Sequence, residues 1–160
     1  MCNQLAQHYQ TLWCPEYARE YLLANNKKYS YQNLLTIAKG QIALEEKYTQ
    51  LLHPNSQFLF IDTDMYVMKV WCEYVFGKCH QYILDEIATR QYNLYLLCNI
   101  DLPWVQDELR EYPDKKTRQE LYKVYKDILV NQSTPWFEVN GTNKQRLYNA
   151  VNAINKFFNK

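Results

Sequence analysis

Glycine is scarce in this sequence, and no glycine-rich loop is present. The 160 residues contain three glycines, Gly40, Gly77 and Gly141. The motif G-x-x-x-x-G-K-S/T, whose backbone N–H groups and lysine cradle phosphates, therefore does not occur. Only Gly77 is followed by a lysine, and the residues before it have the periodicity of a helix rather than of a strand. The chain contains no phosphate-binding loop of this kind.

Long apolar runs and an excess of charge are also missing. No apolar stretch approaches the roughly 20 residues of a membrane-spanning helix. Lys and Arg together number 18 against 17 Asp and Glu, which gives a formal net charge of +1. Because a nucleic-acid or anionic-membrane binder needs a basic surplus, we expect neither kind of partner.

Ordered cysteine and histidine patterns are absent as well. The five cysteines form no C-x-x-C pair, and an odd count without a framework favours a reducing, cytoplasmic environment. The three histidines lack the spacing of zinc ligands. We therefore expect neither a disulfide framework nor a zinc site.

Apolar and aromatic residues are plentiful, at 48% of the chain, which is enough for one sizeable core in a single domain over residues 1–160. Amphipathic helical patterns follow Ser30 and residue 64, and recur over residues 121–129 and 147–158. Between them, four short apolar runs predict buried strands at residues 11–14, 58–61, 94–98 and 136–139. This alternation indicates an α/β fold with a mostly parallel sheet flanked by helices.

Polar side chains follow all four predicted strands, and three of the four ends carry acidic or basic side chains next to aromatic residues. Because ligands of an open parallel sheet bind outside the carboxyl ends of its strands, we expect a functional site there. Asp62 directly follows an apolar strand, as carboxylates that bind Mg²⁺ beside phosphates commonly do. In chain order, the strand ends carry Glu16 and Arg19, then Asp62 and Asp64, then Asn99, Asp101 and Trp104, and then Asn140, Gly141 and Thr142.

Several of these candidates have a second interpretation. Asp64 either lines the same site or caps the next helix. If Pro15 begins a helix, Glu16 and Arg19 share one helical face. There they either bind a substrate hydroxyl and a phosphate or form a surface ion pair.

The charged segment at residues 104–118 is also open to two interpretations. It is either a lid that closes over a nucleotide, with arginines binding phosphate, or a solvated surface helix. Trp104 either stacks on a planar ring or belongs to the core.

Five segments, taken together, resemble a known family: WCPEYAREYL, FLFIDTDMYVMKVW, YVFGKCH, YNLYLLCNIDLPWVQDELREYPDKKTRQELY and PWFEVNGT. In this order and spacing they resemble the ribosylnicotinamide kinase domain of the NadR type, a family of P-loop kinases of NAD metabolism. The similarity extends over nearly the whole chain. It implies a P-loop kinase-like sheet, ATP and Mg²⁺ as cofactors, and phosphoryl transfer to the 5′-hydroxyl of nicotinamide riboside, which gives nicotinamide mononucleotide.

The resemblance also implies residue roles, by position in the family's motifs. Asp62 would bind Mg²⁺, and Glu16 or Asp64 would orient or deprotonate the acceptor hydroxyl, with Glu16 preferred. The pyridinium ring would stack on Tyr17 and Trp104, since aromatic faces attract cations. The remaining roles are substrate binding by Arg19 and Asp107, contact with the transferred phosphate by Arg110 and Arg118, and adenine binding by Asn140, Gly141 and Thr142.

In that family a strand and a glycine-rich phosphate loop lead into a helix similar to residues 2–9. We therefore expect this sequence to start just after the loop, in a sheet of order 2-3-1-4-5 whose central strand 1 is missing. Without the loop, the 160 residues alone should be inactive. Two alternatives stay open: a non-catalytic nucleotide- or partner-binding protein of the same fold, and a kinase for another nucleoside.

Overall fold

The structure, a computed structural model, describes residues 1–109 and 111–158. Its chain divides into two compact units, Met1–Thr89 and Arg90–Lys160. Both contain parallel strands and helices, so the predicted α/β class is confirmed. Whether residues 1–160 form a single domain stays a prediction.

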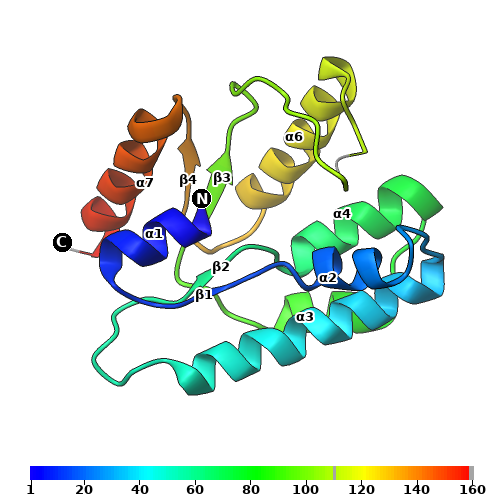
Figure 1. The fold of residues 1–160 in the computed structure, drawn as a ribbon, viewed down its shortest axis with the longest axis horizontal. Helices are drawn as coiled ribbons and strands as arrows, with labels where there is room; N and C mark the ends of the chain where they lie inside the picture. The colour runs from blue at the N-terminus through cyan, green and yellow to red at the C-terminus, as the bar shows by residue number, and fades with distance from the viewer. Residues whose placement is uncertain (110, 159–160) are drawn as a thin grey trace. The chain divides into compact units, whose positions relative to one another are not determined.

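The first unit contains two strands and five helices, shown in Figure 1. Its strands pair in parallel, with Trp13 opposite Phe60 and Cys14 opposite Ile61. In chain order, the elements are α1 (Cys2–Tyr9), β1 (Trp13–Cys14), α2 (Tyr17–Ala24), α3 (Tyr31–Leu51), β2 (Phe60–Ile61), α4 (Met65–Phe76) and α5 (Gln81–Thr89).

Helix ends in this unit follow local side-chain chemistry. Ser30 caps α3 in a capping box with Asn33, whose side chain accepts from the Ser30 N–H at 2.8 Å. Gly77 ends α4 in the left-handed conformation, with φ of +68°, and its N–H donates to the Glu73 carbonyl at 2.9 Å. The predicted helix start at Ser30 is therefore confirmed.

The core of the first unit lies between α2, α3, α4 and α5. The predicted apolar face of α3 is buried at Leu34, Ile37, Ala38 and Ile42, whereas Tyr48 near the end of the helix is half-buried. Figure 1 shows α2 lying along α3. The buried apolar side chains are Ala18, Leu34, Ile37, Ala38, Ile42, Met65, Met68, Cys72 and Ile83.

The second unit contains β3 (Tyr95–Cys98), α6 (Lys115–Val130), β4 (Trp136–Val139) and α7 (Asn143–Phe158). β3 and β4 pair in parallel over four residues, from Tyr95 opposite Trp136 to Cys98 opposite Val139. Helix α7 packs against β4 and α6 against β3 (Figure 1). Without its central strand 1, the expected order 2-3-1-4-5 leaves two separate pairs, strands 2 and 3 and strands 4 and 5. The observed pairs, β1 with β2 and β3 with β4, agree with that order.

Among residues 1–109 and 111–158, no helix has both the length and the apolar character needed to cross a membrane.

Candidate functional site

In the first unit, the register of the strands brings two candidate carboxylates to one edge of the sheet. Cys14 and Ile61 are paired, and the Asp62 N–H donates to the Cys14 carbonyl at 3.1 Å. Because the strands are parallel, Glu16 and Asp62 both follow the carboxyl ends of their strands at the same edge. Both side chains belong to exposed residues. The predicted clustering of these acids after β1 and β2 therefore agrees with the strand pairing.

Pro15 does not begin the helix, so the condition for Glu16 and Arg19 to share a helical face is not met. Glu16 is the N-cap residue of α2, in extended conformation with φ of −72° and ψ of 115°, and the helix begins at Tyr17. The helix starts later than Pro15 because the backbone leaves β1 extended and the Tyr17 N–H is taken up by a side chain of α3. That side chain is Gln41, whose Oε1 accepts from Tyr17 N at 2.7 Å.

Gln41 fixes the turn between β1 and α2. It is only 1% exposed, and its Nε2 donates to the Pro15 carbonyl at 3.3 Å. One buried amide therefore holds the backbone on both sides of Glu16, which prearranges that carboxylate. Sequence reasoning missed Gln41, although a polar residue on the apolar face of a helix, beside Ile37 and Ala38, was a usable signal.

Tyr17 and Arg19 follow on α2. The Tyr17 ring lies against Gly40 of α3, so closely that a Cβ built on Gly40 would be 2.2 Å from Tyr17 Cε1. Tyr17 is half-buried, and Arg19 is exposed on the first turn of α2. Their roles in binding a substrate stay predictions.

Asp64 has the capping role that was one of its two interpretations. Its Oδ1 accepts from the Val67 N–H at 3.1 Å at the start of α4. A carboxylate there satisfies one of the unpaired N–H groups of the first helical turn. A role of Asp64 at the acceptor hydroxyl stays a prediction.

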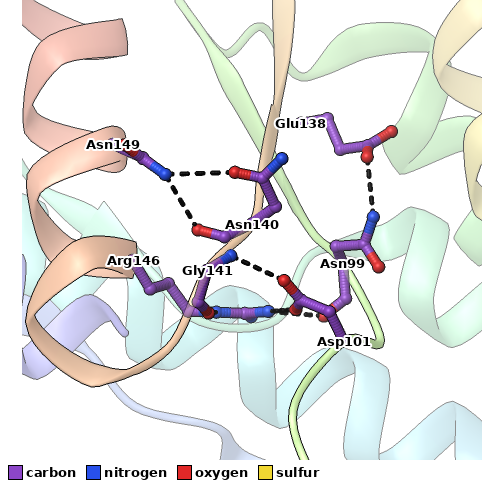
Figure 2. A network of polar contacts seen from close by, with 7 residues as sticks. All are labelled: Asn99, Asp101, Glu138, Asn140, Gly141, Arg146 and Asn149. Carbon is purple, nitrogen blue, oxygen red and sulfur yellow. Dashed lines mark hydrogen bonds and ion pairs between the residues drawn. The ribbon is translucent and has the colours of Figure 1, made fainter.

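In the second unit, the loops after β3 and β4 are joined by a network of polar contacts, shown in Figure 2. The Gly141 N–H donates to Asp101 Oδ2 at 2.6 Å, and Arg146 Nε donates to the Gly141 carbonyl at 3.0 Å. Arg146 Nη2 also donates to the Asn99 carbonyl at 2.8 Å and pairs with Asp101 Oδ1. This clamp holds two of the predicted strand-end loops together.

The clamp also sets the charge state of Asp101. Partial burial by itself raises the pKa of this carboxyl group, but the Gly141 N–H and the Arg146 guanidinium lower it by more. The pKa of Asp101 therefore lies below its ordinary value, and the group is charged near neutral pH. Sequence reasoning missed Arg146, which is only 7% exposed and lies on the face of α7 that also carries Ala150 and Ile154.

A second carboxylate, Glu138 of β4, is held by three neighbours. The Tyr122 hydroxyl, the Lys126 ammonium and the Asn99 amide all stabilise its charged form, and they lower the pKa of Glu138 to about 2. Asn99 Nδ2 donates to Glu138 Oε1 at 2.7 Å, and Lys126 Nζ to Oε2 at 3.0 Å. The same surroundings, together with burial, raise the pKa of Tyr122.

The predicted lid segment is only partly helical. Residues 104–114 precede α6, which Asp114 caps by accepting from the Thr117 N–H at 2.7 Å. Trp104 is half-buried, and Asp107 accepts from the Leu109 N–H at 3.1 Å. Arg118 lies in the first turns of α6, where its buried Nε has no hydrogen-bond partner in the described part of the chain. Arg110 lies outside the described residues.

The remaining candidates for site chemistry are a strand-end carboxylate and two buried thiols. In residues 1–109 and 111–158, no cluster of three or more His, Cys, Asp or Glu is placed to hold a metal ion. A lone strand-end carboxylate such as Asp62 still suits Mg²⁺, which is commonly held by one or two carboxylates together with substrate phosphates. Burial raises the pKa of the Cys14 thiol to about 11 and that of Cys72 to about 12, so neither is a ready nucleophile.

Comparison with known proteins agrees with this fold. A family model described as AAA domain matches residues 1–146. The trifunctional NAD biosynthesis/regulator protein NadR of Escherichia coli is 24% identical over 151 residues, which are 87% of this chain and 34% of that protein. NadR of Salmonella typhimurium is 26% identical over 137 residues, 81% of this chain and 31% of that protein. The chain thus spans about a third of the length of these curated relatives.

Two solved structures share the fold over nearly the whole chain. One is a crystal structure of NadR protein in complex with NR, with a TM-score of 0.81 and 19% identity. The other, of NadR protein in complex with NAD and AMP-PNP, has a TM-score of 0.74 and also 19% identity. Each match covers 99% of this chain and 45% of the solved one. The chain therefore belongs to the AAA domain family.

Proposed function

We propose that this chain forms the body of a ribosylnicotinamide kinase. It would transfer the γ-phosphoryl group of ATP to the 5′-hydroxyl of nicotinamide riboside and so produce nicotinamide mononucleotide. The observation that carries the proposal is the match of 99% of the chain to the fold of NadR crystallised with NR. The carboxylates at the ends of β1 and β2 support it, because phosphoryl transfer uses such groups for the metal and the acceptor.

Glu16 is the stronger candidate for the group that orients or deprotonates the acceptor hydroxyl. Asp64 already accepts a backbone N–H at the start of α4, where it acts as the helix cap. The backbone on both sides of Glu16 is held by Gln41, so the Glu16 carboxylate starts from a fixed position. Asp62 would hold Mg²⁺, which when bound would neutralise phosphate charge.

The other candidates would bind the two substrates. Tyr17 and Trp104 would stack on the pyridinium ring, while Arg19 and Asp107 would complete the riboside site. Arg118, with its unpaired Nε, and Arg110 would contact the transferred phosphate. The loop Asn140–Thr142 would hold the adenine.

We also propose that turnover needs a phosphate-binding loop, which these 160 residues do not contain. The 160 residues hold no G-x-x-x-x-G-K-S/T motif. Removing a single donor of comparable electrostatic stabilisation costs other enzymes about 10²–10³ in rate, so lacking the whole loop should abolish useful turnover.

The test is product analysis with ATP and nicotinamide riboside, by mass spectrometry of nicotinamide mononucleotide. It compares the 160-residue chain with a version extended by the residues encoded upstream. We expect product only from the extended version. Product from a different nucleoside alone would assign another substrate, and bound nucleotide without any product would assign a non-catalytic role.

Within the active version, Glu16→Gln should lower kcat by about 10²-fold or more, as expected for loss of an acid–base group. The matched control is Glu20→Gln, an exposed carboxylate on the same helix with no assigned role. Equal activity of the two variants would refute the role of Glu16 but not the kinase function.

A further inference from the structure

A chain of three side-chain amides connects α7 with the loop that precedes it, and Figure 2 shows the contact of Asn149 with Asn140. Gln145 Nε2 donates to Asn149 Oδ1 at 2.9 Å. Asn149 Nδ2 in turn donates to both oxygens of Asn140, to the backbone carbonyl at 3.1 Å and to Oδ1 at 3.0 Å. Asn149 of α7 therefore holds Asn140 of the loop, and Gln145 in turn holds Asn149.

These contacts fix which way each amide faces. A backbone carbonyl only accepts, so Asn149 must turn its Nδ2 toward Asn140. That same nitrogen meets the Asn140 side chain, which must therefore present its oxygen inward. The Asn140 Nδ2, with two N–H groups, points away from Asn149, as Figure 2 shows. Asn140 is an exposed residue, so these donors face solvent.

The backbone N–H and carbonyl of the next residue, Gly141, are both already hydrogen-bonded within the protein. The Gly141 N–H is bound by Asp101, and its carbonyl is bound by Arg146. Gly141 has φ of +92°, a conformation that side chains rarely adopt, and it turns both groups toward the clamp. On the solvent side, the loop presents the Asn140 amide donors and the Thr142 hydroxyl.

We propose that Asn149 is a positioning residue. It holds the Asn140 carboxamide so that its NH₂ group donates a hydrogen bond to a ring nitrogen of a purine base. The inference rests on the proposed function for the presence of a nucleotide. Its place follows from the parallel pair, because ligands bind outside the carboxyl ends of such strands and Asn140 directly follows β4.

The orientation has a chemical consequence. Because Oδ1 of Asn140 is engaged by Asn149, the side chain acts toward a ligand mainly as a donor. A ring nitrogen of adenine accepts a hydrogen bond from this NH₂ group, whereas a C–H group in the same ring position cannot accept one. The loop therefore selects for an unsubstituted ring nitrogen rather than for an exocyclic amino group.

The test uses adenosine, which needs no phosphate-binding loop, and its analogues 1-deazaadenosine and 7-deazaadenosine, each lacking one ring nitrogen. The 160-residue chain is titrated with each nucleoside by NMR, following the side-chain amide signal of Asn140. We expect adenosine to shift this signal and to bind about two- to tenfold more tightly than one of the analogues, the range for one neutral hydrogen bond.

Variants separate positioning from general stability. Asn140→Ala should bind adenosine and that analogue equally. Asn149→Asp cannot donate to Asn140, so the carboxamide turns over and the preference should also vanish. Asn149→Leu, which adds no charge, should reduce it in the same direction if the Asp variant does not fold. The control Asn152→Asp, exposed on the same helix, should leave the preference unchanged.

Three results would overturn the inference: adenosine shifts no signal of the loop, the wild type binds all three nucleosides equally, or the preference survives in Asn149→Asp and Asn149→Leu. The kinase proposal is decided separately, by formation of nicotinamide mononucleotide. Product formation together with any of these results would refute the role of Asn149 alone.

Discussion

Replacing Asp101 by asparagine should destabilise the second unit. The Asp101 carboxylate accepts from the Gly141 N–H at 2.6 Å with one oxygen and pairs with Arg146 through the other. Asparagine has a single oxygen, so its NH₂ group would face one of these two donors. Arg146, whose side chain is 8% exposed, would keep its charge and lose its anionic partner.

The expected loss in free energy of unfolding is about 2 kcal/mol. A hydrogen bond to a charged group contributes about 1.5–3 kcal/mol, and removing one partner of a fully buried pair costs about 3–5 kcal/mol. The Asp101 side chain is 34% exposed, so solvent screens the pair and the lower range applies. For a chain of this length, a loss of about 2 kcal/mol lowers Tm by roughly 4–8 °C.

The difference in stability between wild type and Asp101→Asn should depend on pH in a defined direction. The folded-state pKa of Asp101 is lowered, so its contribution is fully present above the unfolded value of about 3.9 and is lost as pH falls through the folded value. Protonated Asp101 resembles asparagine. The difference in stability between wild type and Asp101→Asn should therefore be constant from about pH 5 to 8 and shrink below about pH 4.

Thermal and urea unfolding, followed by far-UV circular dichroism at several pH values, would measure these differences. The control is Asp127→Asn on α6, an exposed carboxylate whose Oδ1 accepts only from the Asn131 amide at 3.2 Å. It should change stability by less than about 0.5 kcal/mol. Equal effects of the two substitutions, or a gap for Asp101→Asn that does not shrink in acid, would refute the reasoning.

Three further substitutions test other contacts. Asp64→Ala removes the N-cap of α4 and should cost about 1 kcal/mol in urea unfolding, while Asp64→Ser should recover most of it; equal losses would contradict capping. Gly40→Ala places a methyl group 2.2 Å from the Tyr17 ring and should cost about 1–3 kcal/mol, partly recovered by adding Tyr17→Ala; strictly additive losses would argue against this contact. Glu138→Gln should lower the free energy of unfolding above about pH 4.3, and the difference from wild type should shrink as pH falls toward about 2, where Glu138 itself becomes protonated. A difference that persists at that pH would show that the charge of Glu138 is unimportant.

Local patterns were enough to predict most of the fold. The four apolar runs predicted all of the described strands, and the last predicted strand, residues 136–139, coincides with β4. The first two were predicted too long, because the β1–β2 ladder has only two residue pairs. Before the paired residues, the two segments are connected by a side-chain hydrogen bond, in which the Thr11 hydroxyl donates to the Phe58 carbonyl. Helix α5 was not predicted, since Ile83 is its only fully buried residue and its apolar face is short.

The site was predicted less completely, because its geometry depends on contacts far apart in the sequence. Glu16, Asp62 and Asn140 could be predicted because each follows an apolar run that is recognisable as a strand in the sequence alone. Nothing local pairs Asp101 with Arg146, which lies 45 residues later. The helical start at Pro15 was wrong for the same reason: the Tyr17 N–H is satisfied by Gln41, a residue 24 positions away.

Strand-end loops in both units are held in the same way, by a buried polar side chain of a neighbouring helix. In the first unit, a buried polar side chain of α3, Gln41, binds the backbone on both sides of Glu16. In the second, a buried polar side chain of α7, Arg146, binds the loops after β3 and β4. Burying such a group costs free energy unless it is hydrogen-bonded, so the buried side chain favours the loop conformation that satisfies it. A polar residue on the apolar face of a helix beside a parallel sheet thus indicates which strand-end loop is rigid before a ligand arrives. Gln41→Leu provides the test: it should leave the helical content unchanged and increase hydrogen exchange at Tyr17 N–H, and unchanged protection there would refute this role of the buried amide.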